Sequence, residues 1–242
     1  MGKTLRRPIQ RNLAGKRATQ PQQAQPTSPA AAAPQDRLRL FAKEDEPELR
    51  RVLLGSYDIP GLHFATPPTI LDIGAHAGAA TTFFLRRWPG CSIHAYEPHP
   101  EAVRWFQENT RDSGWSVSLH TRAVVGAEWP DSRALLLDGL RGPWHRSLYQ
   151  LGAQLTTGVQ VDVVRAAALP EAQVLKVSTN GCELAILDSY PFVMRLRAVL
   201  ARCARKADHA AIVERLRPSG LSLARDDSRQ GEMPGEMVFV RS

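Results

Sequence analysis

Short apolar runs alternate with amphipathic segments from residue 69 onward. The apolar runs predict strands at 70–73, 92–96 and 117–121, and the segments between them predict helices at 78–88 and 100–111. Strands that alternate with helices indicate βαβ units, and βαβ units build a parallel sheet. The pattern therefore predicts an α/β fold.

In the second half of the chain, the alternation of apolar runs and amphipathic segments first becomes less regular and then returns. Between Gly126 and Pro170 we expect strands at 135–138 and 159–164, flanking a glycine- and proline-bearing loop where substrate-facing segments could lie. Further along, the sequence predicts strands at 174–178 and 196–201, helices over Glu183–Leu187 and His209–Arg217, and an antiparallel hairpin formed by 221–224 and 237–240.

The N-terminal part of the chain divides into two segments. Residues 1–36 are rich in alanine, glutamine and proline and have little apolar surface to bury, so we predict a disordered tail. The apolar positions between Leu38 and Leu54, broken by Pro47, predict a short helix on each side of an acidic link. We interpret residues 37–66 as a helical brace or lid on a main domain at 67–242.

Charge changes this picture only at the tail. The chain has 31 basic and 24 acidic side chains, a net charge of +7, and a basic protein suggests an anionic partner such as nucleic acid. Residues 1–35 contain six of the basic side chains and no acid, which leaves a nearly neutral remainder. We therefore do not expect a nucleic-acid partner, and the tail fits a solvated segment, a transit peptide or a weak polyanion-binding segment.

Several other classes of protein are disfavoured. No apolar run approaches the roughly 18–20 residues of a membrane-spanning helix, and the N-terminus lacks the apolar region of a secretory signal. The cysteines Cys91, Cys182 and Cys203 are widely spaced, without a CxxC or Cys/His pairing. We expect a soluble protein of a reducing compartment, the cytoplasm, with no membrane partner and no metal.

The most informative segment runs from Ile70 to Thr81. An apolar strand passes through Asp72 into a turn with Gly74 and Gly78, and a helix opening at such a turn can hold a nucleotide-like ligand against its backbone N–H groups. Dinucleotide folds use GxGxxG for a pyrophosphate. The DxGxxxG spacing here puts a carboxylate where it would repel phosphate and attract the cationic aminoacyl end of S-adenosylmethionine. The spacing favours that methyl donor over a nicotinamide cofactor.

A second acid stands at the end of the next predicted strand. Glu97, in Tyr96-Glu97-Pro98, could accept hydrogen bonds from both ribose hydroxyls of the donor. The predicted donor-binding residues are Asp72, Gly74, Ala75, His76, Gly78, Glu97 and Pro98. In the alternative interpretation, Asp72 caps the following helix and Glu97 is a solvated turn residue.

With these residues the chain resembles the FkbM-type methyltransferases, a family of class I S-adenosylmethionine-dependent enzymes. The matching segments are Asp72–Gly78 with Thr81, Tyr96–Pro100, Asn109, Arg122–Gly126 and Leu175–Glu183, within a resemblance that spans roughly residues 67–240. It implies a Rossmann-like fold with a seven-stranded, mostly parallel sheet and an antiparallel last strand. It also implies S-adenosylmethionine as cofactor and methylation of an oxygen on a small or carbohydrate-like acceptor.

The chain departs from the family at acidic positions. Ser178 and Asn180 stand where the family has aspartate and glutamate, and Arg202 stands where it usually has another glutamate. Neither Ser178 nor Asn180 can act as a base or an anionic metal ligand. The catalytic candidates are Glu183 and His145, with His76 packed beside the donor. Two functions stay open: an active methyltransferase, or a donor-binding module that has lost catalysis and acts in regulation or scaffolding.

Overall fold

The computed structural model describes residues 43–111, 116–137, 146–148, 158–227 and 235–241. The chain divides into two units, residues 1–34 and residues 35–242, and all described residues belong to the second. The predicted disordered tail at 1–36 and the catalytic candidate His145 lie outside the described residues.

A seven-stranded sheet forms the centre of this unit. Its order is β3-β2-β1-β7-β8-β10-β9, and all of its neighbouring pairs are parallel except the two that involve β10. The predicted mostly parallel sheet with an antiparallel C-terminal hairpin is therefore confirmed. The strands are β1 (Thr69–Ile73), β2 (Ser92–Tyr96), β3 (Val117–His120), β7 (Val174–Val177), β8 (Ala198–Cys203), β9 (Leu221–Asp226) and β10 (Gly235–Arg241).

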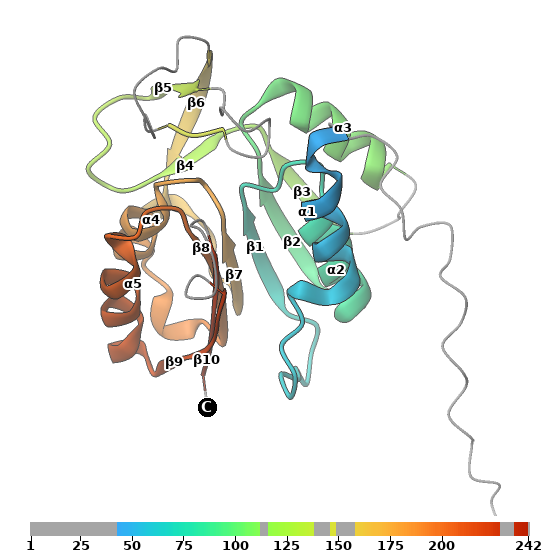
Figure 1. Cartoon of the computed structure of the whole chain (residues 1–242), viewed down its shortest axis with the longest axis vertical. Helices are drawn as coiled ribbons and strands as arrows, with labels where there is room; N and C mark the ends of the chain where they lie inside the picture. Colours follow the sequence, from blue (N-terminus) through green and yellow to red (C-terminus); the bar gives the residue numbers. More distant parts are fainter. Residues whose placement is uncertain (1–42, 112–115, 138–145, 149–157, 228–234, 242) are drawn as a thin grey trace, which may run out of the picture. The chain divides into compact units, whose positions relative to one another are not determined.

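Helices cover both faces of the sheet (Figure 1). One face packs against α1 (Glu46–Arg51), α2 (Ala79–Arg87) and α3 (Pro100–Thr110), and the other against α4 (Glu183–Ser189) and α5 (Asp208–Leu216). Because central strands of a doubly covered sheet are buried on both sides, β1 and β7 are apolar apart from Thr69, Asp72 and Lys176. Within the described part of the chain, no helix is long and apolar enough to cross a lipid bilayer.

A second, three-stranded sheet was not foreseen from the sequence. In it β6 (Gly158–Arg165) pairs in parallel with β4 (Ala123–Val125) and antiparallel with β5 (Arg133–Leu137). The periodicity predicts β5 and β6 as strands but not β4, which has only three residues. This sheet follows the third strand of the main sheet in the chain and contributes one wall of the pocket described below.

The expected break at Pro47 is wrong, whereas the helix expected before the acidic link falls on residues outside the described ones. A 3-10 turn over Lys43–Asp45 runs into α1, which begins at Glu46 and has Pro47 in its first turn, followed by a π-helical turn over Val52–Ser56. A proline fits the first helical turn because its missing N–H would have no intrahelical partner there. Leu49 and Val52 are buried in the same apolar cluster as residues of β1 and α2, so the segment shares the core of the main sheet.

Candidate functional site

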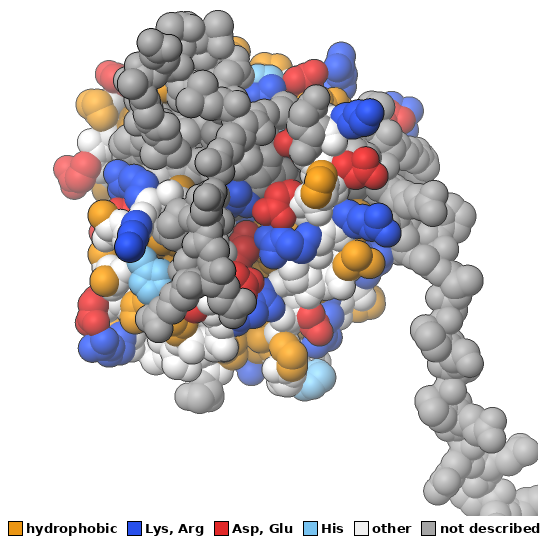
Figure 2. Space-filling view, viewed as in Figure 1, with side chains coloured by type: hydrophobic (Ala, Val, Ile, Leu, Met, Phe, Trp, Pro, Cys, Tyr) orange, Lys and Arg blue, Asp and Glu red, His pale blue; other side chains and the backbone are white. Residues whose placement is uncertain are grey.

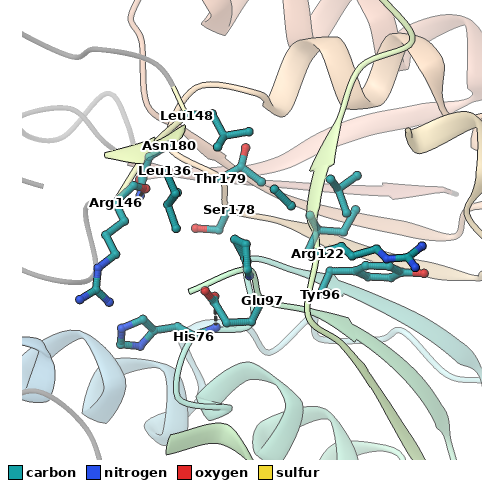
Figure 3. A pocket seen from close by; sticks show the side chains of 15 residues that line it. His76, Tyr96, Glu97, Arg122, Leu136, Arg146, Leu148, Ser178, Thr179 and Asn180 are labelled. Carbon is teal, nitrogen blue, oxygen red and sulfur yellow. Dashed lines mark hydrogen bonds between the residues drawn. The ribbon is translucent and has the colours of Figure 1, made fainter. Parts of the chain in front are cut away.

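A pocket opens at the carboxyl ends of β1 and β2 (Figure 3). This is the edge of a parallel sheet where ligands bind in open α/β folds. Its walls come from both sheets and from the loop that follows β7: Ile73, Gly74, His76, Tyr96, Glu97, Pro98, Arg122, Ala123, Val124, Leu136, Arg146, Leu148, Ser178, Thr179 and Asn180.

The turn after β1 forms the floor of this pocket and depends on two glycines. Gly74 has a left-handed φ of +76°, and a Cβ atom on it would lie 2.0 Å from the carbonyl oxygen of Ser178. The N–H groups of Gly74 and Ala75 both donate to the Tyr96 carbonyl, at 2.9 and 3.0 Å, which ties the turn to β2. Gly78, with φ of +87°, is the N-cap residue of α2. Ala75 and Gly78 shape the turn and do not line the pocket.

Asp72 lies beneath the turn and is not part of the pocket wall. Its carboxylate accepts a hydrogen bond from the Thr81 hydroxyl at 2.7 Å and lies 3.1 Å from the Lys176 ammonium group. The same ammonium group donates to the Gly74 carbonyl at 2.6 Å. Asp72 thus holds the turn through Thr81 and Lys176. The alternative interpretation of Asp72 as a helix cap is wrong, because the N-cap residue is Gly78 and no side chain caps it.

Glu97 extends from the tip of β2 into the pocket wall and is only 6% exposed. One carboxylate oxygen accepts the His76 N–H at 2.8 Å, and the other accepts the His99 N–H at 2.8 Å. The alternative that Glu97 is a solvated turn residue is therefore wrong. Each carboxylate oxygen has two acceptor sites, so the group can accept further hydrogen bonds while its backbone partners keep it in place.

His76 has a backbone conformation that is rare for residues other than glycine. Its φ is +49°, and its imidazole Nε2 lies 3.2 Å from an Asp45 carboxylate oxygen in the segment before α1. The imidazole also packs edge-on against Trp105 of α3, with ring centroids 5.5 Å apart. From the same helix, the Asn109 amide donates to the Ala77 carbonyl at 2.8 Å. Such a strained, multiply held residue is typical of a ligand-facing turn.

The loop after β7 is organised by Glu183, which lies outside the pocket wall. Its carboxylate accepts the N–H groups of Thr179 and Gly181, at 2.7 and 2.8 Å, and the Thr179 hydroxyl at 3.1 Å. Burial raises the pKa of the Glu183 carboxyl, although these hydrogen bonds act in the opposite direction. The contacts make Glu183 a brace for the loop that carries Ser178 and Asn180.

Two residues of the site, Arg146 and Asp45, could not be identified from the sequence. The Asn180 amide donates to the Arg146 carbonyl at 2.9 Å, and the Ser147 hydroxyl donates to the Asn180 carbonyl at 2.6 Å, which fixes Arg146 at the pocket wall. Asp45 reaches His76 from a turn 31 residues earlier in the chain. Neither residue belongs to a recognisable motif, so no local signal could have revealed them.

Arg202 does not reach the pocket wall. It is buried at the end of β8, and its guanidinium donates to the Glu48 carboxylate of α1 at 3.3 Å. Burial alone would raise the pKa of Glu48, but the hydrogen bonds and charges of Arg51 and Arg202 lower it overall. The position thus joins the sheet to α1. Among the described residues, no group of three or more His, Cys, Asp or Glu side chains is placed to hold a metal ion.

Comparison with known proteins identifies the fold. The sequence matches no family model and no curated protein. A solved methyltransferase FkbM from Methylobacillus flagellatus KT superposes with a TM-score of 0.51 at 13% identity, over 83% of this chain and 56% of that one. Precorrin-6y C5,15-methyltransferase from Geobacter metallireducens GS-15 gives a TM-score of 0.44 at 15% identity, over 75% and 84% of the two chains.

The first of these likenesses concerns the fold alone, because the sequence identity is low. This chain spans just over half of that protein's length. Together with the strand order, the likeness identifies the predicted Rossmann-like α/β methyltransferase fold.

Proposed function

We propose that the protein binds S-adenosylmethionine and transfers its methyl group to an oxygen of a small or carbohydrate-like acceptor. The observation that carries this proposal is the placement of Glu97. A carboxylate held by two backbone N–H groups at the tip of β2 stands beside the left-handed turn at Gly74. The methyltransferase fold and the absence of a GxGxxG sequence support this donor over a dinucleotide.

The residues around the turn fit the donor in different ways. The remaining acceptor sites of Glu97 suit the two ribose hydroxyls, and Gly74 brings bare backbone close to the ligand. His76 and Pro98 complete this side of the wall. Asp72, which has no surface in the pocket, acts as a positioning residue through Thr81 and Lys176.

The donor supplies a methyl group already activated by its sulfonium, so the chain's main contribution is to hold the two reactants in line. A general base typically adds about 10²–10⁴-fold for an alcohol acceptor. Glu183 braces its own loop, which makes it a positioning residue in this proposal. His145 stays a candidate base from the sequence.

A second candidate function is a donor-binding module without catalysis. The neutral side chains of Ser178 and Asn180 in the pocket wall favour it, because neither can take a proton from an acceptor hydroxyl. The intact arrangement of Glu97 and Gly74 is compatible with both functions, so donor binding alone does not separate them.

Calorimetric titration tests the proposal. We expect S-adenosylmethionine and its demethylated product to bind the full chain, and Glu97→Gln to weaken both by about 10- to 100-fold, since hydrogen bonds to a charged group contribute about 1.5–3 kcal/mol. The exposed Glu128 provides the control, and Glu128→Gln should bind as the wild type does. Absence of binding by the wild type contradicts both functions. Binding without methyl transfer to any acceptor tried favours the module.

A further inference from the structure

The charges on the pocket wall are uneven. Among its described residues, the wall has one carboxylate, Glu97, whose two oxygens already accept backbone N–H groups. It has two guanidinium groups, those of Arg122 and Arg146. Figure 3 shows Arg122 beside the ring of Tyr96, pointing away from Glu97 and Ser178, whereas Arg146 extends toward the side where His76 lies. Arg146 is thus the cation on the side of the pocket where His76 lies.

Arg146 is held at this place by its backbone. Its carbonyl accepts the Asn180 amide, and the neighbouring Ser147 exchanges two backbone hydrogen bonds with Leu137 of β5, at 2.8 and 3.1 Å. The short segment 146–148 is therefore joined both to the second sheet and to the loop after β7. A segment whose backbone is already held in place loses less conformational entropy when it binds a ligand, which suits a recognition residue.

One partner of the Arg146 guanidinium among the described residues can be displaced. Its Nη2 lies 3.3 Å from a carboxylate oxygen of Glu101 on α3. The Arg146 side chain is 12% exposed and that of Glu101 is 45% exposed, so the glutamate can turn into solvent at little cost. An oxyanion inside the pocket could form a bidentate pair with the guanidinium, which is stronger than a contact to one half-exposed oxygen.

Two neutral side chains of the same pocket wall, those of Ser178 and Asn180, leave room for a negative charge. Ser178 and Asn180 are neutral and carry hydrogen-bond donors, so they would not repel an anion as carboxylates would. We propose that Arg146 binds an oxyanion of the acceptor, a carboxylate or a phosphate, and thereby selects acidic acceptors. This inference rests on the proposed function, since it places the acceptor beside the donor in the same pocket.

Three probes that share their ring hydroxyls test the inference: glucose, glucuronate and glucose 6-phosphate. Each is titrated into the full chain saturated with S-adenosylhomocysteine, and binding is followed by ligand-observed NMR. We expect glucuronate or glucose 6-phosphate to bind at least about tenfold more tightly than glucose. The tighter of the two charged probes identifies the carboxylate or the phosphate as the recognised group.

Four variants test whether Arg146 causes the preference for charged probes. Arg146→Gln should reduce the preference to within about twofold, and Arg146→Lys should retain part of it as a point charge. Arg133→Gln is the matched control, because this exposed arginine of β5 does not line the pocket, and it should bind as the wild type does. Glu101→Gln removes the competing carboxylate and should strengthen binding of the charged probe about two- to fivefold.

The outcomes separate this inference from the proposed function. Unchanged affinity for S-adenosylhomocysteine shows that each variant is folded and keeps its donor site. Equal affinity of the wild type for all three probes, including no measurable binding of any, overturns the inference, and so does a preference that survives in Arg146→Gln. Failure of the wild type to bind S-adenosylhomocysteine contradicts the proposed function instead.

Discussion

Gly74 is the residue where the turn after β1 tolerates least change. An alanine would combine a left-handed φ of +76° with a Cβ atom 2.0 Å from the Ser178 carbonyl oxygen, which is backbone and cannot swing away. The conformation alone costs about 1 kcal/mol, and displacing a central strand end adds to it. We expect Gly74→Ala to lower the free energy of unfolding by more than about 3 kcal/mol in urea denaturation.

A substitution at Gly61 separates the cost of the left-handed backbone from the cost of the close approach to Ser178. Gly61 has nearly the same φ, +81°, but a Cβ atom there would meet nothing within 4 Å. Gly61→Ala should therefore cost about 1 kcal/mol. Similar losses in both variants would mean that backbone conformation, and not the approach to Ser178, makes glycine necessary in the turn.

Glu183 makes stability depend on pH in a predictable direction. Burial raises the pKa of its carboxyl above the usual 4.5, so folding favours the protonated form. This contribution is present below the unfolded-state pKa and is lost as the pH rises through the raised value. We expect the stability difference between the wild type and Glu183→Gln to shrink as the pH rises from about 4.5 to 7.5.

Urea denaturation at a series of pH values measures this difference. Asp188→Asn, at the exposed end of the same helix, serves as the control and should keep the wild-type pH profile. A constant or growing difference between the wild type and Glu183→Gln would contradict the direction of the shift.

For single residues, the sequence could predict a place in the site only where the residue stands at a fixed spacing from the end of a strand. The glycine turn and Glu97 stand at fixed distances from strand ends, so spacing could predict that Gly74, His76, Glu97 and Pro98 would come together. Arg146 and Asp45 reach the site through tertiary contacts alone. For Asp72, spacing placed the residue in the right element but could not show that its carboxylate faces Thr81 and Lys176.

Among the elements, α1 depends on an ion pair that crosses to the sheet. The Glu48 carboxylate accepts from Arg51 on its own helix and from the buried Arg202 of β8. Removing the Glu48 charge would take one carboxylate partner away from the buried guanidinium of Arg202, which is costly where water is excluded. We expect Glu48→Gln to cost about 1–2 kcal/mol of stability, less than for a fully buried pair because Glu48 is partly exposed.

Two further variants test this role of the pair. Glu46→Gln changes an exposed acid in the first turn of the same helix and should stay within about 0.5 kcal/mol of the wild type. In a double-mutant cycle, Glu48→Gln combined with Arg202→Met should cost less than the sum of the single changes. Additive costs would show that the pair contributes nothing to holding α1.

The elements of the main sheet could be predicted because each is long enough to show its period. The strands at β1, β2 and β7 read as apolar runs, and the helices between them read as amphipathic segments. The second sheet could not be predicted, since pairing between β4 and β6 joins segments about 40 residues apart and β4 has three residues. Pro47 was misjudged because a proline breaks a helix interior but is accepted in the first turn.

In the whole molecule, most of the excess positive charge belongs to a different part of the chain from the described fold. Figure 2 shows acidic and basic side chains intermixed on the visible face of the described part, in keeping with the near balance of charges beyond residue 35. The net charge of +7 belongs mostly to the six basic side chains of residues 1–35. The described residues that line the pocket all belong to the unit at 35–242.

Deletion of residues 1–34 should therefore change binding to polyanions and leave donor binding intact. We expect the affinity for S-adenosylhomocysteine to stay within about twofold, because Glu97 and the turn at Gly74 keep their contacts, while retention on a heparin column falls sharply with the lost charges. The matched control is the full chain with its six basic tail residues changed to glutamine, which should elute with the deletion variant. Loss of donor binding in the deletion variant, but not in this control, would make the tail part of the site through something other than charge.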